Sequence, residues 1–222
     1  MRLIGVRIET PDVAAGAERY ATLLGVVPAI RPDGARRFAL ERGVLELADG
    51  TAGGATILFA RERPDDAFAS DPAVHGVAFR VEDAPASAAA PAGLVEAIDH
   101  VVIFTPDPPR TIACWRDANG LRLAFDKEFP ERRIRLMFFR SGGLTLEYAC
   151  PLPAPDDPSG PDRFYGVSYR VRDVSAHRAA LLAAGFDVSE IRAGNKAGTR
   201  VASVRSGTAE VPTLLLENVP AS

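Results

Sequence analysis

Residues 97–123 read AIDHVVIFTPDPPRTIACWRDANGLRL, and this stretch decides the fold because the chain repeats its pattern. It contains a short apolar strand, an aspartate, an amphipathic helix and a glycine. The same order occurs at 4–26 (IGVRIETPDVAAGAERYATLLGV), at 165–186 (YGVSYRVRDVSAHRAALLAAGF) and, in shorter form, at 75–94. Such a period indicates repeated supersecondary units.

The residues that flank each predicted helix explain where it begins and ends. An aspartate carboxylate before a helix accepts hydrogen bonds from backbone N–H groups of the first turn. A glycine after the last turn adopts the left-handed conformation that ends a helix. The full copies have both signals, in the pairs Asp12 and Gly25, Asp107 and Gly120, and Asp173 and Gly185.

After the helix, three copies continue into a predicted hairpin with a glycine turn, within 36–49, 135–149 and 199–218. The second strand of each hairpin ends with a glutamate after apolar residues: Glu46, Glu147 and Glu217. A further strand is predicted at ATILFA, and the Pro- and Asp-rich segment 151–164 is predicted to be a linker.

Bulk properties restrict the possible partners. The chain has 222 residues and a formal net charge of -3, without a lysine or arginine block, so we expect no nucleic-acid partner. Its two cysteines, Cys114 and Cys150, are expected to be free buried thiols of a reducing compartment. No apolar run approaches the roughly 20 residues that span a bilayer, and no signal peptide is evident, so we expect a cytoplasmic protein with no membrane contact.

The repeated pattern resembles the vicinal-oxygen-chelate superfamily, also called the glyoxalase / bleomycin-resistance / dioxygenase family. The stretches DHVVIFTPDP, CWRDANGLRL, FFRSGGLTLEYA and GVSYRVRDVSAHRAALLAAGFDVSEI carry the resemblance. It implies an α+β fold of tandem βαβββ modules, whose sheets form half-open barrels with helices outside. It further implies a degenerate glyoxalase-like domain at 1–95, with one full and one truncated module, and a complete paired-module domain at 97–220.

In metal-using members of this family, the first strand of a module supplies a histidine or similar ligand and the last strand a glutamate. His100 and Glu147 fall on these positions in the third copy, and Glu217 on the last-strand position of the fourth. The remaining position is Gly166, which cannot ligate. One imidazole and two carboxylates suit zinc, iron, manganese or nickel. His177, on a predicted outer helix, is expected to be solvated.

Arginines on the same faces open a metal-free alternative. Side chains two apart on a strand share a face, which places Arg170 in the hollow of the fourth copy and Arg7 in the equivalent place of the first. An inward arginine neutralises a buried carboxylate without any ion. The hypothesis is therefore a polar cluster of His100, Glu147, Glu217 and Arg170, with or without a metal.

Further side chains are candidates for contact with a substrate. Ser168 shares the hollow face with Arg170, and Phe139 lies on a strand whose inward face the sequence leaves open. In RAGNKAGTR (192–200), Lys196 and Arg200 are candidates to bind an anionic group, the alternative being a simple turn. The P-loop spacing GxxxxGK[ST] is absent there, and we expect no nucleotide cofactor.

Two functions of different classes remain. In the first, a cation chelates two substrate oxygens while Glu147 or Glu217 moves a proton, as in an isomerase, epimerase or glyoxalase-like lyase. Ring-cleaving dioxygenase chemistry requires a second histidine that the pattern lacks. In the second, a metal-free hollow binds a small molecule without catalysis. Modules could pair within one chain or between two, so a homodimer is one arrangement.

Overall fold

The computed structural model describes residues 1–68, 75–83 and 93–219. The chain consists of two compact units. Unit 1 comprises Met1–Gly5, Ala55–Ser87 and His100–Tyr165; unit 2 comprises Val6–Gly54, Ala88–Asp99 and Gly166–Ser222. The first copy of the repeat therefore shares unit 2 with the fourth, whereas the division by repeats into 1–95 and 97–220 stays a prediction.

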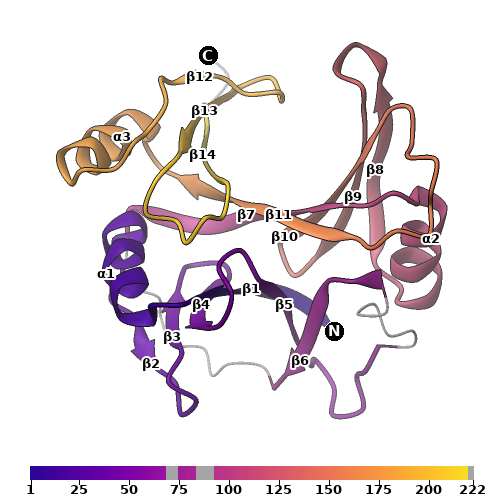
Figure 1. Cartoon of the computed structure of the whole chain (residues 1–222), viewed down its shortest axis with the longest axis horizontal. Coiled ribbons are helices and arrows are strands. Elements are labelled where there is room, and N and C mark those ends of the chain that lie inside the picture. Colours follow the sequence, from indigo (N-terminus) through magenta and orange to yellow (C-terminus); the bar gives the residue numbers. More distant parts are fainter. Residues whose placement is uncertain (69–74, 84–92, 220–222) are drawn as a thin grey trace. The chain divides into compact units, whose positions relative to one another are not determined.

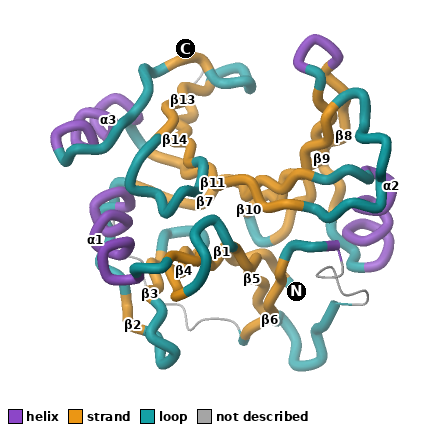
Figure 2. The backbone as a smooth tube through the Cα atoms, viewed as in Figure 1, coloured by secondary structure: helices purple, strands orange, loops and turns teal. Residues whose placement is uncertain are grey.

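Three long strands pass from one unit into the other along the chain: β1 (Arg2–Thr10), β7 (Val95–Phe104) and β11 (Arg163–Val171). Strands and loops make up most of the described chain, and helices are few (Figure 2). The strand orders of both units are open rather than closed on themselves. The mixed α+β class predicted from the sequence is confirmed.

Unit 1 holds the third copy of the repeat from His100 onward, with α2 and strands β8 to β10 (Figure 1). Its strands have the orders β11-β7-β10-β9-β8 and β1-β5-β6. Strands β8, β9 and β10 pair with one another in antiparallel order. Of these three, β10 pairs with β7, and that pair is parallel. The elements that lie wholly in this unit are β5 (Ala55–Ala60), β6 (Ala78–Glu82), α2 (Pro108–Ile112), β8 (Arg122–Phe129), β9 (Ile134–Ser141) and β10 (Leu144–Pro151).

Unit 2 has the strand orders β2-β3-β4-β1 and β12-β13-β14-β11-β7. Helix α1 packs on β3 and β4, and helix α3 packs on β13 and β14. Its own elements are α1 (Val13–Leu24), β2 (Ala29–Ile30), β3 (Arg36–Ala39), β4 (Val44–Asp49), α3 (Val174–Ala183), β12 (Arg192–Ala193), β13 (Thr199–Val204) and β14 (Thr213–Asn218).

The predicted helix caps are confirmed in all three full copies. Asp12 accepts a hydrogen bond from the N–H of Ala15 at 2.9 Å, and Asp107 accepts one from Arg110 at 3.0 Å. Asp173 accepts hydrogen bonds from the first turn of α3 in the same way. The three predicted terminating glycines are left-handed, with φ of 67°, 69° and 77°. The helix predicted within 75–94 falls largely on 84–92 and lies outside the described residues.

Trp115 attaches the helical segment of unit 1 to its strands. Helix α2 continues as a π-helical segment, Ala113–Ala118, in which Trp115 is 1% exposed. Its indole N–H donates to the hydroxyl of Tyr148 on β10 at 2.8 Å, and its ring stacks on Phe59 of β5 at 5.7 Å. The segment therefore has a fixed orientation on the strands, which positions the turn that leads into β8.

In unit 2, the helices of the first and fourth copies share buried contacts. The hydroxyl of Tyr20 on α1 donates to the carbonyl of Thr208 at 3.0 Å. His177 on α3 is 2% exposed, and its Nε2 lies 2.9 Å from the carbonyl oxygen of Leu23. The expectation that His177 is solvated was wrong, because the residue lies on the buried side of α3 with Val174 and Leu181.

The remaining sequence expectations have mixed outcomes. The three hairpins and the strand at 55–60 are present, and both cysteines are free and buried. The predicted linker is held in place at one end by Arg110, whose guanidinium donates to the carbonyl of Gly160 at 3.1 Å and to Asp162 at 2.7 Å. In the described part of the chain, no helix has the length and apolar character needed to cross a membrane.

Candidate functional site

His100 and Glu147 are brought together in unit 1. Thr145 on β10 pairs with His100 on β7, and Glu147 pairs with Val102, so His100 and Glu147 are offset by two residues in the register of adjacent parallel strands. The Nε2 of His100 lies 3.7 Å from the Oε2 of Glu147. Their side chains are 17% and 16% exposed, so both are accessible to a ligand while held by the sheet.

The exposure pattern of β7 shows which face is open. His100, Val102 and Phe104 are partly exposed, whereas Val101 and Ile103 are buried. Successive side chains of a strand point to opposite faces, so the first three share the open face. The parity argument made from the sequence is therefore confirmed for this strand.

Aromatic rings continue the open face beyond the acidic residue. Phe138 on β9 pairs with Glu147, and residues directly opposite in a sheet share a face. Its ring stacks on Phe125 of β8 at 4.8 Å, which in turn stacks on Phe129 at 6.2 Å. We call this set, His100, Glu147, Phe138, Phe125 and Phe129, the aromatic face.

Phe139, predicted to contact a substrate, lies in the core instead. It is fully buried, and its ring packs edge-to-face on Tyr148 at 6.0 Å. The partly exposed aromatic residue of this strand is Phe138. The register of the hairpin decides between the two rings, because it pairs Glu147 with Phe138 and Leu146 with Phe139. The sequence alone left that choice open.

Glu217 lies in unit 2 and has its own partners. Its Oε2 accepts hydrogen bonds from the backbone N–H of Val174 at 2.9 Å and from Arg200 at 2.7 Å. Val174 is the first residue of α3, so the carboxylate also sits at the positive end of that helix. These contacts give Glu217 a structural role at the start of the helix.

Arg170 in unit 2 has an acidic partner that the sequence analysis did not name. Its guanidinium pairs with Asp99 of β7, with the Nε hydrogen bond at 3.2 Å. Ser168, its neighbour on the same face, is 3% exposed. Gly166 precedes both, and a Cβ there would clash with the carbonyl oxygen of Pro212. This close approach is a physical reason for glycine at the position where the family pattern has a ligand.

The segment RAGNKAGTR forms the turn between β12 and β13, which the sequence analysis gave as the alternative to an anion site. The N–H of Gly194 donates to the carbonyl of Thr199 at 2.9 Å, which closes the turn. Lys196 is exposed at its tip, whereas Arg200 is engaged by Glu217. An anion-binding role for Lys196 and Arg200 stays a prediction.

The residues present do not fit the metal centre that the resemblance implies. Within residues 1–68, 75–83 and 93–219, no group of three or more His, Cys, Asp or Glu side chains is arranged to hold a metal ion. His100 and Glu147 supply two donors, fewer than the three or four protein ligands usual at zinc sites.

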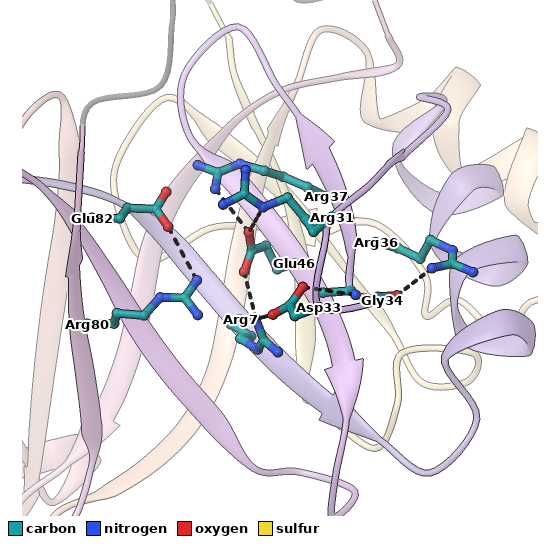
Figure 3. A network of polar contacts seen from close by, with 10 residues as sticks. Arg7, Arg31, Asp33, Gly34, Arg36, Arg37, Glu46, Arg80 and Glu82 are labelled. Atoms are coloured by element: carbon teal, nitrogen blue, oxygen red, sulfur yellow. Dashed lines mark hydrogen bonds and ion pairs between the residues drawn. The ribbon is translucent and has the colours of Figure 1, made fainter.

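Sequence reasoning named Arg7 and Glu46 but missed their association in unit 2 (Figure 3). Glu46 is fully buried on β4 and lies within 3.3 Å of Arg7, 3.0 Å of Arg37 and 3.5 Å of Arg31. The idea that an inward arginine neutralises a strand-end glutamate is thus realised here by Arg7, whereas Arg170 has another partner. The sequence signal that could have revealed this association is the strand-end glutamate, which recurs in three copies of the repeat.

The charges of this network shift the pKa of Asp33. A hydrogen bond from Arg7 at 2.7 Å holds the pKa of the Asp33 carboxyl below its usual value. The pKa of Arg7 is raised, because its bonds to Asp33 and Glu46 outweigh the opposing effect of its burial. Both groups therefore stay charged over the ordinary pH range.

These strands and helices define an α+β protein of the glyoxalase-like class. Residues 99–202 match the family model described as Glyoxalase/Bleomycin resistance protein/Dioxygenase superfamily, and this part of the chain is a glyoxalase-like region of that superfamily. The match confirms the resemblance seen in the sequence, and it includes both His100 and Glu147. No curated protein matches the chain.

Several solved structures are similar to parts of the chain. A methylmalonyl-CoA epimerase from Mycobacterium tuberculosis is 22% identical over 57% of this chain and 91% of its own, with a TM-score of 0.48. A selenomethionine methylmalonyl-CoA epimerase is 20% identical over 59% and 99%, with a TM-score of 0.49. A hypothetical protein from Bacillus halodurans C-125 is 16% identical over 56% and 96%, with a TM-score of 0.47.

Proposed function

We propose that unit 1 binds a small oxygenated metabolite on the aromatic face, with His100 and Glu147 as its polar contacts. The single observation that supports this most is the 3.7 Å separation of the two side chains on a partly exposed strand face. Ligand sites combine apolar lining with a few convergent polar groups. Phe138 and Phe125 supply the apolar part beside Glu147.

The two polar groups offer complementary hydrogen bonds. A neutral imidazole donates through one ring nitrogen and accepts through the other, and a carboxylate only accepts. A ligand with a hydroxyl next to a carbonyl matches this set, because it can donate to Glu147 and accept from His100. Rings of the aromatic face would stack on a planar or apolar portion of the same ligand.

A second candidate function is proton transfer at a carbon next to a carbonyl, the isomerase class of reaction. The same pair supports it, because a general acid–base catalyst must lie within hydrogen-bond reach of the proton that it moves. In this scheme Glu147 removes the proton and His100 donates to the carbonyl oxygen on which negative charge develops. The proton then returns to the carbon, which leaves the atoms of the substrate unchanged in number.

Substitutions on the aromatic face test binding. Small hydroxy acids, keto acids and their esters should be screened by thermal shift, and the best ligand measured by calorimetry. We expect His100→Ala and Glu147→Gln each to weaken its binding about 10-fold, the loss of one hydrogen bond to the ligand. The matched control is Glu128→Gln, because Glu128 is exposed on β8 at a position of opposite parity to Phe125 and Phe129. An unchanged affinity in both site variants would refute the proposal.

Isotope exchange distinguishes a catalytic function from binding alone. If Glu147 moves a proton, the ligand incubated in heavy water gains deuterium at the carbon beside its carbonyl, and Glu147→Gln abolishes this gain. Tight binding without deuterium incorporation would leave sequestration as the function. Elemental analysis of the purified protein, run in parallel, tests whether zinc, iron, manganese or nickel contributes after all.

We also propose a cytoplasmic protein that exists without nucleic-acid or membrane partners. The formal net charge of -3 supports the first exclusion, since nucleic-acid-binding domains carry a basic surface. A homodimer remains a proposal, and light scattering of the purified chain decides it.

A further inference from the structure

Two arginines lie directly opposite each other on the strands of unit 1. Arg122 on β8 pairs with Arg140 on β9, and the row continues through Thr145 on β10 to His100 on β7. Residues that pair across neighbouring strands share a face of the sheet. The row that begins with the two arginines therefore ends at His100 of the aromatic face. We call Arg122 and Arg140 the arginine pair.

A β-bulge gives the arginine pair this orientation. Arg122 and Phe125 are three residues apart on β8, and side chains three apart on a regular strand point to opposite faces. The register shifts between Leu123 and Phe125, which inserts one extra residue into β8. Arg122 therefore lies on the same face as Phe125, opposite Arg140. Bulges commonly redirect side chains next to functional sites.

The arginine pair works against the stability of its hairpin. Like charges directly opposite each other in a sheet are destabilising, and both arginines are exposed. The nearby acid Asp126 lies on the other face of β8, where its carboxylate accepts two hydrogen bonds from Arg135 at 2.8 Å. An anion bound between the two guanidinium groups would remove their repulsion.

We propose that the ligand of the aromatic face carries an anionic group, a phosphate or a carboxylate, and that the arginine pair binds it. This inference rests on the function proposed for unit 1 and adds the class of ligand. A guanidinium presents its N–H donors in a planar fork that matches the oxygens of either group. Two such forks on one face provide a contact that a single exposed arginine does not.

The spacing of the row limits the shape of this ligand. Neighbouring strands lie about 4.8 Å apart, so the backbones of Arg140 and His100 are separated by about 10 Å. Because an arginine side chain is long, a ligand of a few carbon atoms can contact both residues. The anionic group is then separate from the hydroxyl and carbonyl that contact His100 and Glu147.

Calorimetric titration of the full chain with matched probes tests the inference. Dihydroxyacetone phosphate has a hydroxyl next to a carbonyl and a phosphate at its other end, whereas dihydroxyacetone lacks the phosphate. We expect the phosphorylated probe to bind at least 10-fold more tightly, on the order of one charge-assisted hydrogen bond, and to lose this preference at high salt. Malate and lactate, which differ by one carboxylate, form the corresponding pair and distinguish the two anionic groups.

Substitutions of the arginine pair locate the contact. Arg122→Ala and Arg140→Ala should each abolish the preference for the charged probe and leave the affinity for dihydroxyacetone unchanged. Arg140→Lys retains the charge without the fork and should keep part of the preference. Arg116→Ala is the matched control, because it removes the same charge from the π-helical segment of unit 1, where Arg116 pairs with Asp117. These variants should fold, since the first two remove a repelling charge.

The outcomes distinguish this inference from the function proposed for unit 1. Equal affinities within both probe pairs, or a preference that survives in Arg122→Ala and Arg140→Ala, would overturn the inference, as would a lack of binding by every probe. His100→Ala should weaken both members of a probe pair alike. If it weakens neither, while the preference still depends on the arginine pair, the anion contact stands and the proposed role of His100 fails.

Discussion

At the scale of single residues, three equivalent glutamates have three different environments. Glu147 faces His100 on an accessible face, Glu217 binds the start of α3 and Arg200, and Glu46 is buried among arginines. The position on the strand is the same, so the partners determine what each carboxylate does. A functional assignment transferred from position alone would have treated all three as ligands.

His177 predicts a pH dependence of stability. Burial lowers the pKa of its imidazole below the usual 6.5, and hydrogen bonds with the backbone of Leu23 and Leu94 offset part of this effect. The unfolded chain therefore takes up the proton at higher pH than the folded chain. The contribution of neutral His177 to the stability of the folded chain is complete above pH 6.5. It is lost as the pH falls through the lowered pKa of the folded state.

Urea unfolding measured between about pH 7 and about pH 5 checks this effect, at about 1.4 kcal/mol for each unit of pKa shift. We expect His177→Gln to reduce the acid sensitivity, because glutamine can still donate to the carbonyl of Leu23 but does not titrate in this range. His75→Gln is the matched control and should retain the sensitivity. Equal pH profiles in all three chains would contradict the assignment.

Sequence reasoning located Glu147 because a strand-end glutamate recurs in three copies, and it located His100 because the family resemblance implies a first-strand histidine at that position. It could not decide which of Phe138 and Phe139 lies on the partly exposed face of β9. The two side chains are equally hydrophobic, and only the hairpin register assigns each ring to a face. It also did not foresee that Arg170 pairs with Asp99. A long arginine side chain reaches several acids, and strand parity gives its face but not which acid on a neighbouring strand is nearest.

At the scale of elements, the strongest predictions were those that rest on two independent signals. An aspartate cap marks the start of each full helix and a left-handed glycine marks its end, so the sequence predicted both ends of α1 and α3. The π-helical segment after α2 was missed, because its apolar pattern resembles that of an ordinary helix. Strand β8 was also missed, since its exposed charged residues hide the alternation that identifies a strand.

The contact between Trp115 and Tyr148 predicts how firmly the π-helical segment is held. Burial raises the pKa of Tyr148 well above its usual range, so the hydroxyl stays protonated. Tyr148→Phe leaves the buried indole N–H without its acceptor and should lower the free energy of unfolding by about 1–3 kcal/mol. Tyr165→Phe, at a 48% exposed residue, should change it by less than about 0.5 kcal/mol.

A double-mutant cycle isolates the hydrogen bond itself. Trp115→Phe removes the donor and part of the ring, and the combined variant loses both partners. If the bond couples the two residues, the combined loss should be smaller than the sum of the single losses by about 1 kcal/mol. Strict additivity in urea unfolding would show that packing against Phe59, rather than the hydrogen bond, fixes the segment.

At the scale of the whole molecule, the repeat was readable but the partners of each copy were not. Each copy has the same signals, so the sequence gives no preference for pairing neighbours over distant copies. The structure groups the first copy with the fourth in unit 2. Contacts within unit 2 come from helix residues that the shared signals do not include, such as Tyr20, Arg19 and His177, and a comparison of those signals ignores them.

This grouping predicts the behaviour of a fragment that spans 97–222. Division by repeats expects the fragment to fold as a complete domain. Within unit 2, however, it would lose Leu23 as acceptor for His177, Tyr20 as donor to Thr208, and the guanidinium of Arg19 that lies 3.7 Å over the ring of Phe186. Buried polar groups deprived of partners cost about 1–3 kcal/mol each, a large part of the stability of a small domain. We therefore expect circular dichroism in urea to show a lower midpoint and a broader transition than for the full chain. A fragment that unfolds as sharply as the full chain, at the same midpoint, would instead favour the boundary at 95–97 and make these contacts dispensable.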